Sequence, residues 1–193
     1  MRADARKNRD HLLAVAGTAV TEQGVDVSLR DIARRADVGL ATLLRHFPTR
    51  EALLDALLRT GFDELAAQAA ALESLGSPRD ALAEWLRDFV AWTTEYRGVT
   101  TLMAAAIEDT ESALHASCVT LRAAGARLLA RAQAEGAARR DIDGADLFAL
   151  VAMLAWLGDQ PALASRADRL FGVVAGAILT GTGHGNTEGA DPR

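Results

Sequence analysis

Residues 40–47 carry the side chains that are best suited, by type and spacing, to recognise another molecule. On a helix, positions three, four and seven residues apart share one face. The inner face is apolar throughout and consists of Leu40, Leu43, Leu44 and Phe47. The outer face is small, polar and basic and consists of Ala41, Thr42, Arg45 and His46. Arginine can hydrogen bond to guanine O6 and N7, so this face suits a DNA major groove, although any short amphipathic helix has the same spacing.

Other reactive residues form no recognisable catalytic or metal-binding motif. The four histidines are scattered, and no Ser–His–Asp arrangement, carboxylate pair or phosphate loop is present. His115 and Cys118 share a helix face, but zinc requires three or four ligands. We therefore expect no enzyme activity, no catalytic residue, no metal and no cofactor. The lone cysteine is better explained as part of a helical core.

The elements around residues 40–47 are predicted to be short helices joined by tight turns. A helix over residues 10–23 ends at Gly24, because glycine readily ends helices. Ser28 caps a second helix over 29–36, and Thr49 caps a fourth over 50–73. The third helix, over 40–46, follows a three-residue break and is stopped by Pro48. This order predicts a helix-turn-helix.

The charge distribution agrees with a nucleic-acid-binding N-terminal part. The chain has a formal net charge of −5, yet residues 1–50 hold nine basic and six acidic side chains. The acidic excess lies in the remainder of the chain. A basic head on an acidic body is expected when only the head meets phosphates.

Composition favours an all-α, cytoplasmic protein. Of the 193 residues, 50% are hydrophobic but only 5% are aromatic, and four prolines leave room for long helices. The single cysteine indicates a reducing compartment. The longest apolar run, residues 147–158, is too short to span a membrane, and the polar first eleven residues do not resemble a signal peptide.

The stretch from His11 to Leu57 resembles the TetR family of transcriptional regulators. It reads HLLAVAGTAVTEQG, followed by SLRDIARRADVGLATLLRHFPTREALLDAL. The order of the capped second helix, the turn, the third helix and the opening of the fourth matches without a gap. Two residues depart from the family pattern: Asp37 replaces a turn glycine that needs a left-handed backbone, and Leu44 replaces a tyrosine whose hydroxyl contacts phosphate. We expect aspartate to tolerate the turn and Leu44 to lose that contact.

The resemblance implies that the third helix enters the major groove of a double-stranded, palindromic operator. Thr42 and Arg45 are the strongest candidates for base or backbone contact. The complete set of expected DNA-binding residues is Ser28, Arg30, Ala41, Thr42, Arg45, His46, Thr49 and Arg50. The basic N-terminal tail is either disordered or lies along an adjacent groove.

In the C-terminal part, the helix that begins at Pro78 has an aromatic stripe. Ser77 caps it, Pro78 opens it, and its aromatic residues recur at intervals that place them on one face. Either the stripe fills a core or it forms the wall of a cavity for an apolar or aromatic small molecule. The expected ligand-pocket residues are Trp85, Phe89, Trp92, Tyr96, Met103 and Trp156.

The last two predicted helices, over residues 145–157 and 161–179, are candidates for a homodimer interface. The first is apolar almost all round, so it must be covered on every side. Pairing with copies from a second chain into a four-helix bundle would cover it, as in TetR-like proteins. The expected interface residues are Leu147, Val151, Leu154, Leu170, Val174 and Ile178.

These observations predict about nine helices in two parts. Residues 1–52 form the DNA-binding domain, residues 53–180 form the ligand-binding and dimerisation domain, and the fourth helix links them. Residues 181–193 are expected to be a disordered tail. The expected function is repression relieved by a small-molecule effector. An activator, or a helical ligand-binding module with weakened DNA binding, remains an alternative.

Overall fold

The computed structural model describes residues 2–74 and 76–180 of the chain. The described part is all-α, as the sequence predicts, with an isolated bridge between Ala138 and Leu179 as its only β-type pairing. Its helices are α1 (Arg2–Gln23), α2 (Leu29–Arg35), α3 (Leu40–His46), α4 (Arg50–Glu73), α5 (Pro78–Glu95), α6 (Val99–Glu108), α7 (His115–Ala134), α8 (Gly144–Asp159), the 3-10 helix η1 (Ala164–Arg166) and α9 (Ala167–Ile178).

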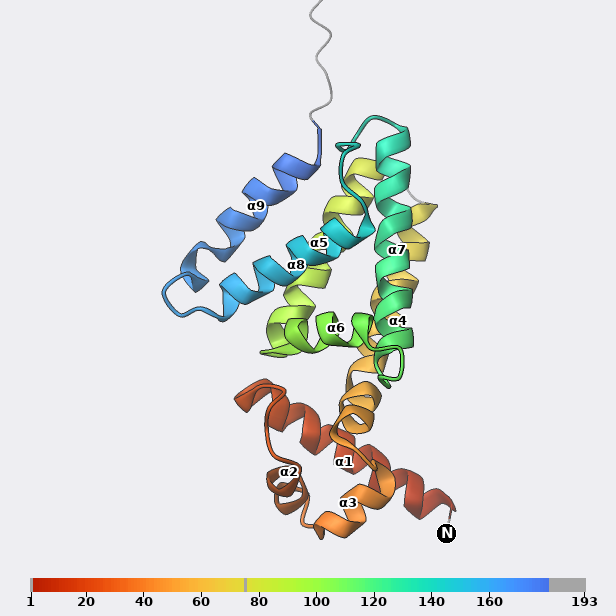
Figure 1. Ribbon diagram of the computed structural model, residues 1–193, viewed down its shortest axis with the longest axis vertical. Helices are drawn as coiled ribbons and strands as arrows, with labels where there is room; N and C mark the ends of the chain where they lie inside the picture. The colour runs from red at the N-terminus through yellow and green to blue at the C-terminus, as the bar shows by residue number, and fades with distance from the viewer. Residues whose placement is uncertain (1, 75, 181–193) are drawn as a thin grey trace, which may run out of the picture.

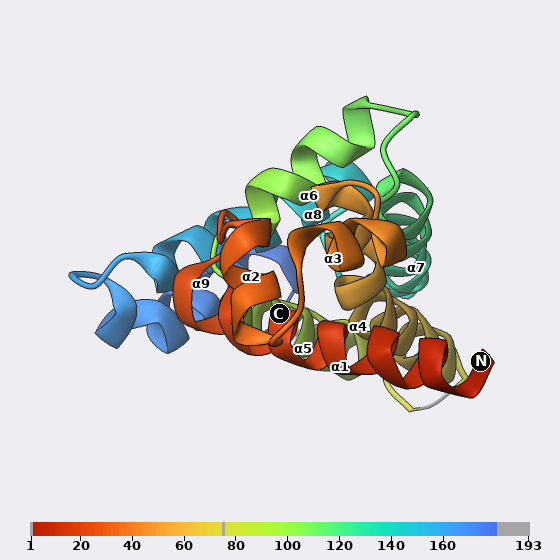
Figure 2. The ribbon, with the colours of Figure 1, turned by 90° about the horizontal axis from the view of Figure 1, so that it is seen from below.

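The helices are arranged as a small head and a larger body. Helices α1, α2 and α3 form the head at one end, and α4 runs from the head into the body (Figure 1). In the body, α4 packs mainly against α7 and α5, and α8 packs against α5 and α7. Helix α9 lies at the outer edge, beyond α8 and α5 (Figure 1). Seen from below, the head covers part of the body, with α1 running along one side (Figure 2).

Local capping signals position the helices of the head as predicted. The Ser28 hydroxyl accepts a hydrogen bond from the Asp31 backbone N–H at 3.0 Å, and the Thr49 hydroxyl accepts one from Ala52 N–H at 3.0 Å. Each bond satisfies a backbone donor that the first turn of a helix leaves free. Gly24 has φ of 90° at the end of α1, and Asp37 adopts the expected left-handed conformation with φ of 53°.

Two close contacts between tryptophan and glycine join α5 to its neighbours in the body. A Cβ atom on Gly125 of α7 would lie 2.4 Å from the ring of Trp85, and one on Gly61 of α4 would lie 2.2 Å from Trp92. Both tryptophans belong to α5, so the missing glycine side chains allow α5 to approach two neighbouring helices closely. Trp85 also donates its indole N–H to the Leu65 carbonyl of α4 at 2.9 Å. The aromatic stripe of α5 therefore fills the core between α4 and α7.

Two sequence-based helix boundaries are wrong. Helix α1 begins at Arg2, so the predicted N-terminal tail is instead helical backbone. The last helix begins at Ala167 and not at residue 161, because a turn and the short η1 precede it. The predicted disordered tail over 181–193 lies outside the described residues. No helix in the described part combines the length and hydropathy needed to cross a membrane.

Candidate nucleic-acid interface and cavity

The exposed face of α3 is centred on Ala41, Leu44 and Arg45. All three are exposed, and they share one face because they are spaced by three and four residues. Thr42 and His46, predicted to lie on this face, are half-buried. Leu44, predicted to pack inward, is 36% exposed, whereas Leu43 and Phe47 fill the core of the head. The outward surface of α3 is thus apolar and basic, and its centre is shifted from the one that the sequence predicts.

Two arginines of the head are free to meet an anion. Arg30 on α2 and Arg45 on α3 are exposed, and neither forms a hydrogen bond or ion pair with the described residues. Arg34, by contrast, pairs with Asp31 at 2.6 Å, and Arg35 pairs with Glu22 at 2.6 Å. These pairs partly neutralise the charge of both arginines.

Asp31 is kept ionised by its neighbours in the head. The Arg34 guanidinium and the Ser28 hydroxyl hydrogen bond to its carboxylate and lower its pKa below the ordinary value. Ser28 is exposed, but its hydroxyl is already engaged with Asp31. The Thr49 hydroxyl is likewise engaged in capping α4. The Ser28 hydroxyl already donates its proton to Asp31, whereas the Thr49 hydroxyl has no acceptor among the described residues and can donate to a phosphate oxygen.

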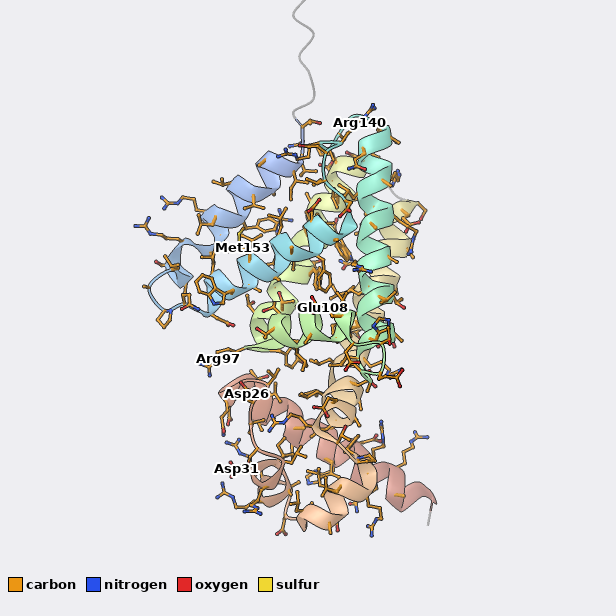
Figure 3. The ribbon with its side chains drawn as sticks, viewed as in Figure 1. Asp26, Asp31, Arg97, Glu108, Arg140 and Met153 are labelled. Carbon is orange, nitrogen blue, oxygen red and sulfur yellow. The ribbon has the colours of Figure 1, made fainter. Side chains whose placement is uncertain are left out.

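Arg50 has a structural partner that the sequence did not predict. This half-buried side chain donates a hydrogen bond to the Val25 carbonyl at 2.8 Å, joining the start of α4 to the loop between α1 and α2. The Val25 N–H in turn donates to the Arg97 carbonyl of the body at 3.0 Å. Arg97 and Asp26 lie on opposite sides of this junction (Figure 3). Arg50 therefore belongs to the connection between head and body.

A cavity of about 550 Å³ lies between the head, α4 and the loop before α7. Its lining includes His46, Arg9 and Arg59. His46 is thus directed toward the junction and away from the centre of the exposed α3 surface. The Arg9 guanidinium lies over the Phe47 ring, 5.2 Å from its centroid, and ties α1 to the end of α3.

The predicted ligand-pocket residues do not line the main cavity of the body. Trp85, Phe89 and Met103 are buried, and Trp92 and Tyr96 are half-buried against one another with ring centroids 5.3 Å apart. These residues pack in the core, which is the alternative that the sequence left open. Trp156, the sixth residue, is 55% exposed on α8. The stripe is therefore better described as core packing than as a cavity wall.

The main cavity instead opens on the opposite face of α5, between α5, α8 and α9, with a volume of about 760 Å³. Val90, Leu154 and Phe171 contribute to its largely apolar lining. Arg79 and Arg87 bring positive charge to it, and the Arg87 guanidinium lies 5.4 Å from the centroid of the Phe171 ring. The cavity can accommodate a small apolar molecule and offers it charged groups. Sequence reasoning missed it because its walls come from helices far apart in the chain.

The predicted dimer-interface residues differ in how far the protomer itself buries them. Leu147, Val151, Leu154 and Ile178 are buried within the protomer, and Leu170 and Val174 are half-buried. The four buried side chains pack α8 and α9 against the rest of the chain, whereas Leu170 and Val174 keep part of their surface exposed and remain predicted interface residues. The large apolar side chains exposed on these two helices are Met153, Trp156 and Val173, which are 42%, 55% and 64% exposed. Met153 is labelled on α8 in Figure 3.

Comparison with known proteins identifies the family. The profile of the bacterial regulatory proteins of the tetR family matches residues 12–57, and that of the C-terminal domain of SbtR-like transcriptional regulators matches residues 77–177. The structure of a TetR transcriptional regulator from Streptomyces coelicolor is similar to this chain, with 34% identity and a TM-score of 0.60. The similarity covers 90% of this chain and 99% of that one. The chain belongs to the TetR family.

A second solved structure agrees with this assignment. The structure of a TetR transcription regulatory protein from Mycobacterium vanbaalenii is similar to this chain, with 30% identity and a TM-score of 0.58. The similarity covers 93% of this chain and 99% of that one. No curated protein sequence matches the chain. The protein is therefore a DNA-binding transcriptional regulator of the TetR family. Regulators of this family bind DNA operators and small molecules, function as dimers and are typically not enzymes.

Cys118 of this TetR-family protein is a core residue. Burial, with a smaller contribution from the nearby Asp55 carboxylate, raises the pKa of its thiol to about 11. A protonated thiol is a poor nucleophile and metal ligand. Among the described residues, no group of three His, Cys, Asp or Glu side chains could hold a metal ion.

The Arg50 contact predicts a loss of stability that does not depend on DNA. Arg50→Ala removes a charged hydrogen bond to a part-buried carbonyl, so the free energy of unfolding should fall by about 1.5–3 kcal/mol. Urea denaturation of the free protein measures this change. Arg45→Ala, which removes no contact within the described chain, is the matched control and should leave unfolding unaltered. If Arg50→Ala weakened DNA binding at unchanged stability, the phosphate-contact role predicted from the sequence would be correct instead.

Proposed function

We propose that this TetR-family regulator is a cytoplasmic, homodimeric repressor that leaves its operator when a small molecule binds to the body. The observation that carries the DNA-binding part is the exposed face of α3, where Arg45 has no partner among the described residues. Arg30 on α2, also unpaired among the described residues, lines a hollow with Leu40 at the start of α3. Free guanidinium groups can bind phosphates, which positions the protein on the duplex, and can hydrogen bond to guanine in the major groove. Residues 1–52 act as the DNA-binding domain, and residues 53–180 bind the effector and the second copy.

The dimer is proposed to form through the exposed apolar face of α8 and α9. Met153, Trp156 and Val173 together present large apolar side chains to solvent on two adjacent helices. Ala177, a small residue one turn after Val173, is also exposed on α9 and would permit a close helix–helix approach. Two heads held in this way would meet two half-sites of a palindromic operator.

The effector is proposed to bind in the cavity between α5, α8 and α9. Its apolar lining favours a hydrophobic molecule. Arg79 and Arg87 together outweigh the single carboxylate of Asp168 in the lining, so they favour a molecule that also carries a negative charge. Because α9 contributes both to this cavity and to the proposed dimer face, a ligand that prefers one position of α9 would change the spacing of the two heads. DNA affinity then falls by the difference in the ligand's affinity for the two arrangements.

Arg45→Ala should weaken binding to a specific duplex by about fivefold to 150-fold, the cost of losing a bidentate guanine contact. The measurement is fluorescence anisotropy at fixed salt with a duplex selected from a random library, and with random duplex for comparison. Arg34→Ala is the matched control. Its guanidinium already pairs with Asp31, so its effect should stay within about twofold. Equal losses on specific and random DNA would contradict base reading by Arg45.

Val173→Asp should convert the dimer to a monomer, because a charge would be buried in an apolar helix interface. Sedimentation equilibrium measures the mass, and the same variant should lose affinity for the selected duplex. Ala130→Asp, on the exposed side of α7, is the control and should remain dimeric. A dimeric Val173→Asp protein would place the interface elsewhere.

Medium-chain and aromatic carboxylates should raise the melting temperature more than their uncharged amides do. At a ligand concentration of about 100 times Kd, the stabilisation is about 2.7 kcal/mol. In Arg87→Gln the difference between acid and amide should shrink, since this variant loses one of the two guanidinium groups of the cavity. Arg140→Gln is the control, because Arg140 lies exposed at the far end of the body (Figure 3). Equal stabilisation of Arg87→Gln and the unaltered protein by the acids would exclude this cavity as their site.

A further inference from the structure

Leu44 has an unusual position for a large apolar side chain. It is 36% exposed on α3, although Leu43 beside it is fully buried. Ala41 precedes it by three residues and Arg45 follows it directly, and both are exposed. Leu44 therefore lies at one edge of the outward surface of α3, and Ala41 lies between it and the free guanidinium of Arg45.

The chemistry of leucine limits what this surface can recognise. An aliphatic side chain cannot donate or accept a hydrogen bond, so it gains nothing from a phosphate or from the polar edge of a base. In the major groove, the C5-methyl of thymine is the apolar group that a base edge offers. When leucine contacts the thymine methyl, both groups withdraw apolar surface from water, which is favourable. Cytosine has no methyl group at this position, so the leucine surface gains no apolar partner there.

We propose that Leu44 is a specificity-determining residue that reads the methyl group of a thymine in each operator half-site. This inference rests on the proposed entry of α3 into the major groove. The same position would otherwise offer DNA only an exposed hydrocarbon surface. Arg45 on α3, together with Arg30 near the α2–α3 turn, supplies the positive charge that brings a polyanion to the head.

The spacing of the exposed residues predicts the layout of the half-site. Side chains three residues apart on a helix have Cβ atoms about 5–6 Å apart. Successive base pairs rise by about 3.4 Å, so Ala41 and Leu44 reach positions one or two base steps apart. Arg45 is the immediate neighbour of Leu44 and can address a guanine close to the thymine. The half-site should therefore contain a thymine, read by Leu44, near a guanine.

Replacing thymine by uracil tests this directly, because it removes the methyl group and leaves base pairing intact. The unaltered protein first selects duplexes from a randomised library, and each thymine of the selected site is then changed to uracil in both half-sites. At one position, uracil should weaken binding about fourfold per half-site, the value of one buried methyl-sized group. Leu44→Ala should bind the thymine and uracil duplexes equally at that position. Leu44→Met, which keeps an apolar side chain, should retain a preference for thymine.

Arg30→Ala separates this inference from DNA binding in general. It should weaken binding to both duplexes by the same factor and leave the thymine-to-uracil ratio unchanged. Failure of the unaltered protein to bind any duplex would remove the proposed function as well as this inference. Binding without a uracil-sensitive position, or a Leu44→Ala protein that keeps the full sensitivity, would overturn the role of Leu44 alone. The uracil test on the unaltered protein does not depend on whether the variants fold.

Discussion

Helix α4 constrains the whole structure because it belongs to both the head and the body. Its first turns bury Leu53, Leu54 and Leu58, and its later turns bury Phe62 and Leu65. The helix is continuous over Arg50–Glu73, with no proline inside it. A helix of this kind bends little, so a rotation of its body end displaces its head end. The position of α3 relative to the body is therefore set largely by what packs against α4.

That packing depends on α5, and it leaves little freedom. Trp92 lies against Gly61 of α4, and Trp85 lies against Gly125 of α7. A close-packed contact of this type has few alternative arrangements, because protein interiors hold few voids. The opposite face of α5 forms part of the main cavity. One helix thus separates the close-packed part of the body from the cavity that is proposed to bind the effector.

A second connection between head and body runs through the loop that follows α1. The Val25 backbone accepts from Arg50 and donates to Arg97, so it is joined to α4 and to the α5–α6 turn at once. Gly24 and Gly98 adopt positive φ at this contact, and a Cβ on Gly24 would lie 3.1 Å from the Arg97 carbonyl oxygen. The head is accordingly held at two places, which restrains its rotation about α4.

The sequence predicted the features that depend on neighbours in the chain, and it failed where distant contacts decide. Ser28, Thr49 and Asp37 act within one helical turn, so capping and turn preferences were sufficient. The direction of the α5 stripe could not be predicted in the same way, since its partners Gly61 and Gly125 are remote in sequence. In α8, an almost wholly apolar helix, the pattern did not reveal which face is buried. Packing against α5 and α7 determines that face.

Leu44 illustrates the same limit on a smaller scale. Spacing assigned it to the inner side of α3, because it lies beside Leu43 and four residues after Leu40. A seven-residue helix cannot bury so wide an arc against α1 and α2, however, and its edge remains in contact with solvent. An exposed leucine of this kind contributes less to the stability of the fold than a buried one. Under the proposed entry of α3 into the major groove, the same exposed edge would belong to the recognition surface, and its apolar character would then be explained by what it binds.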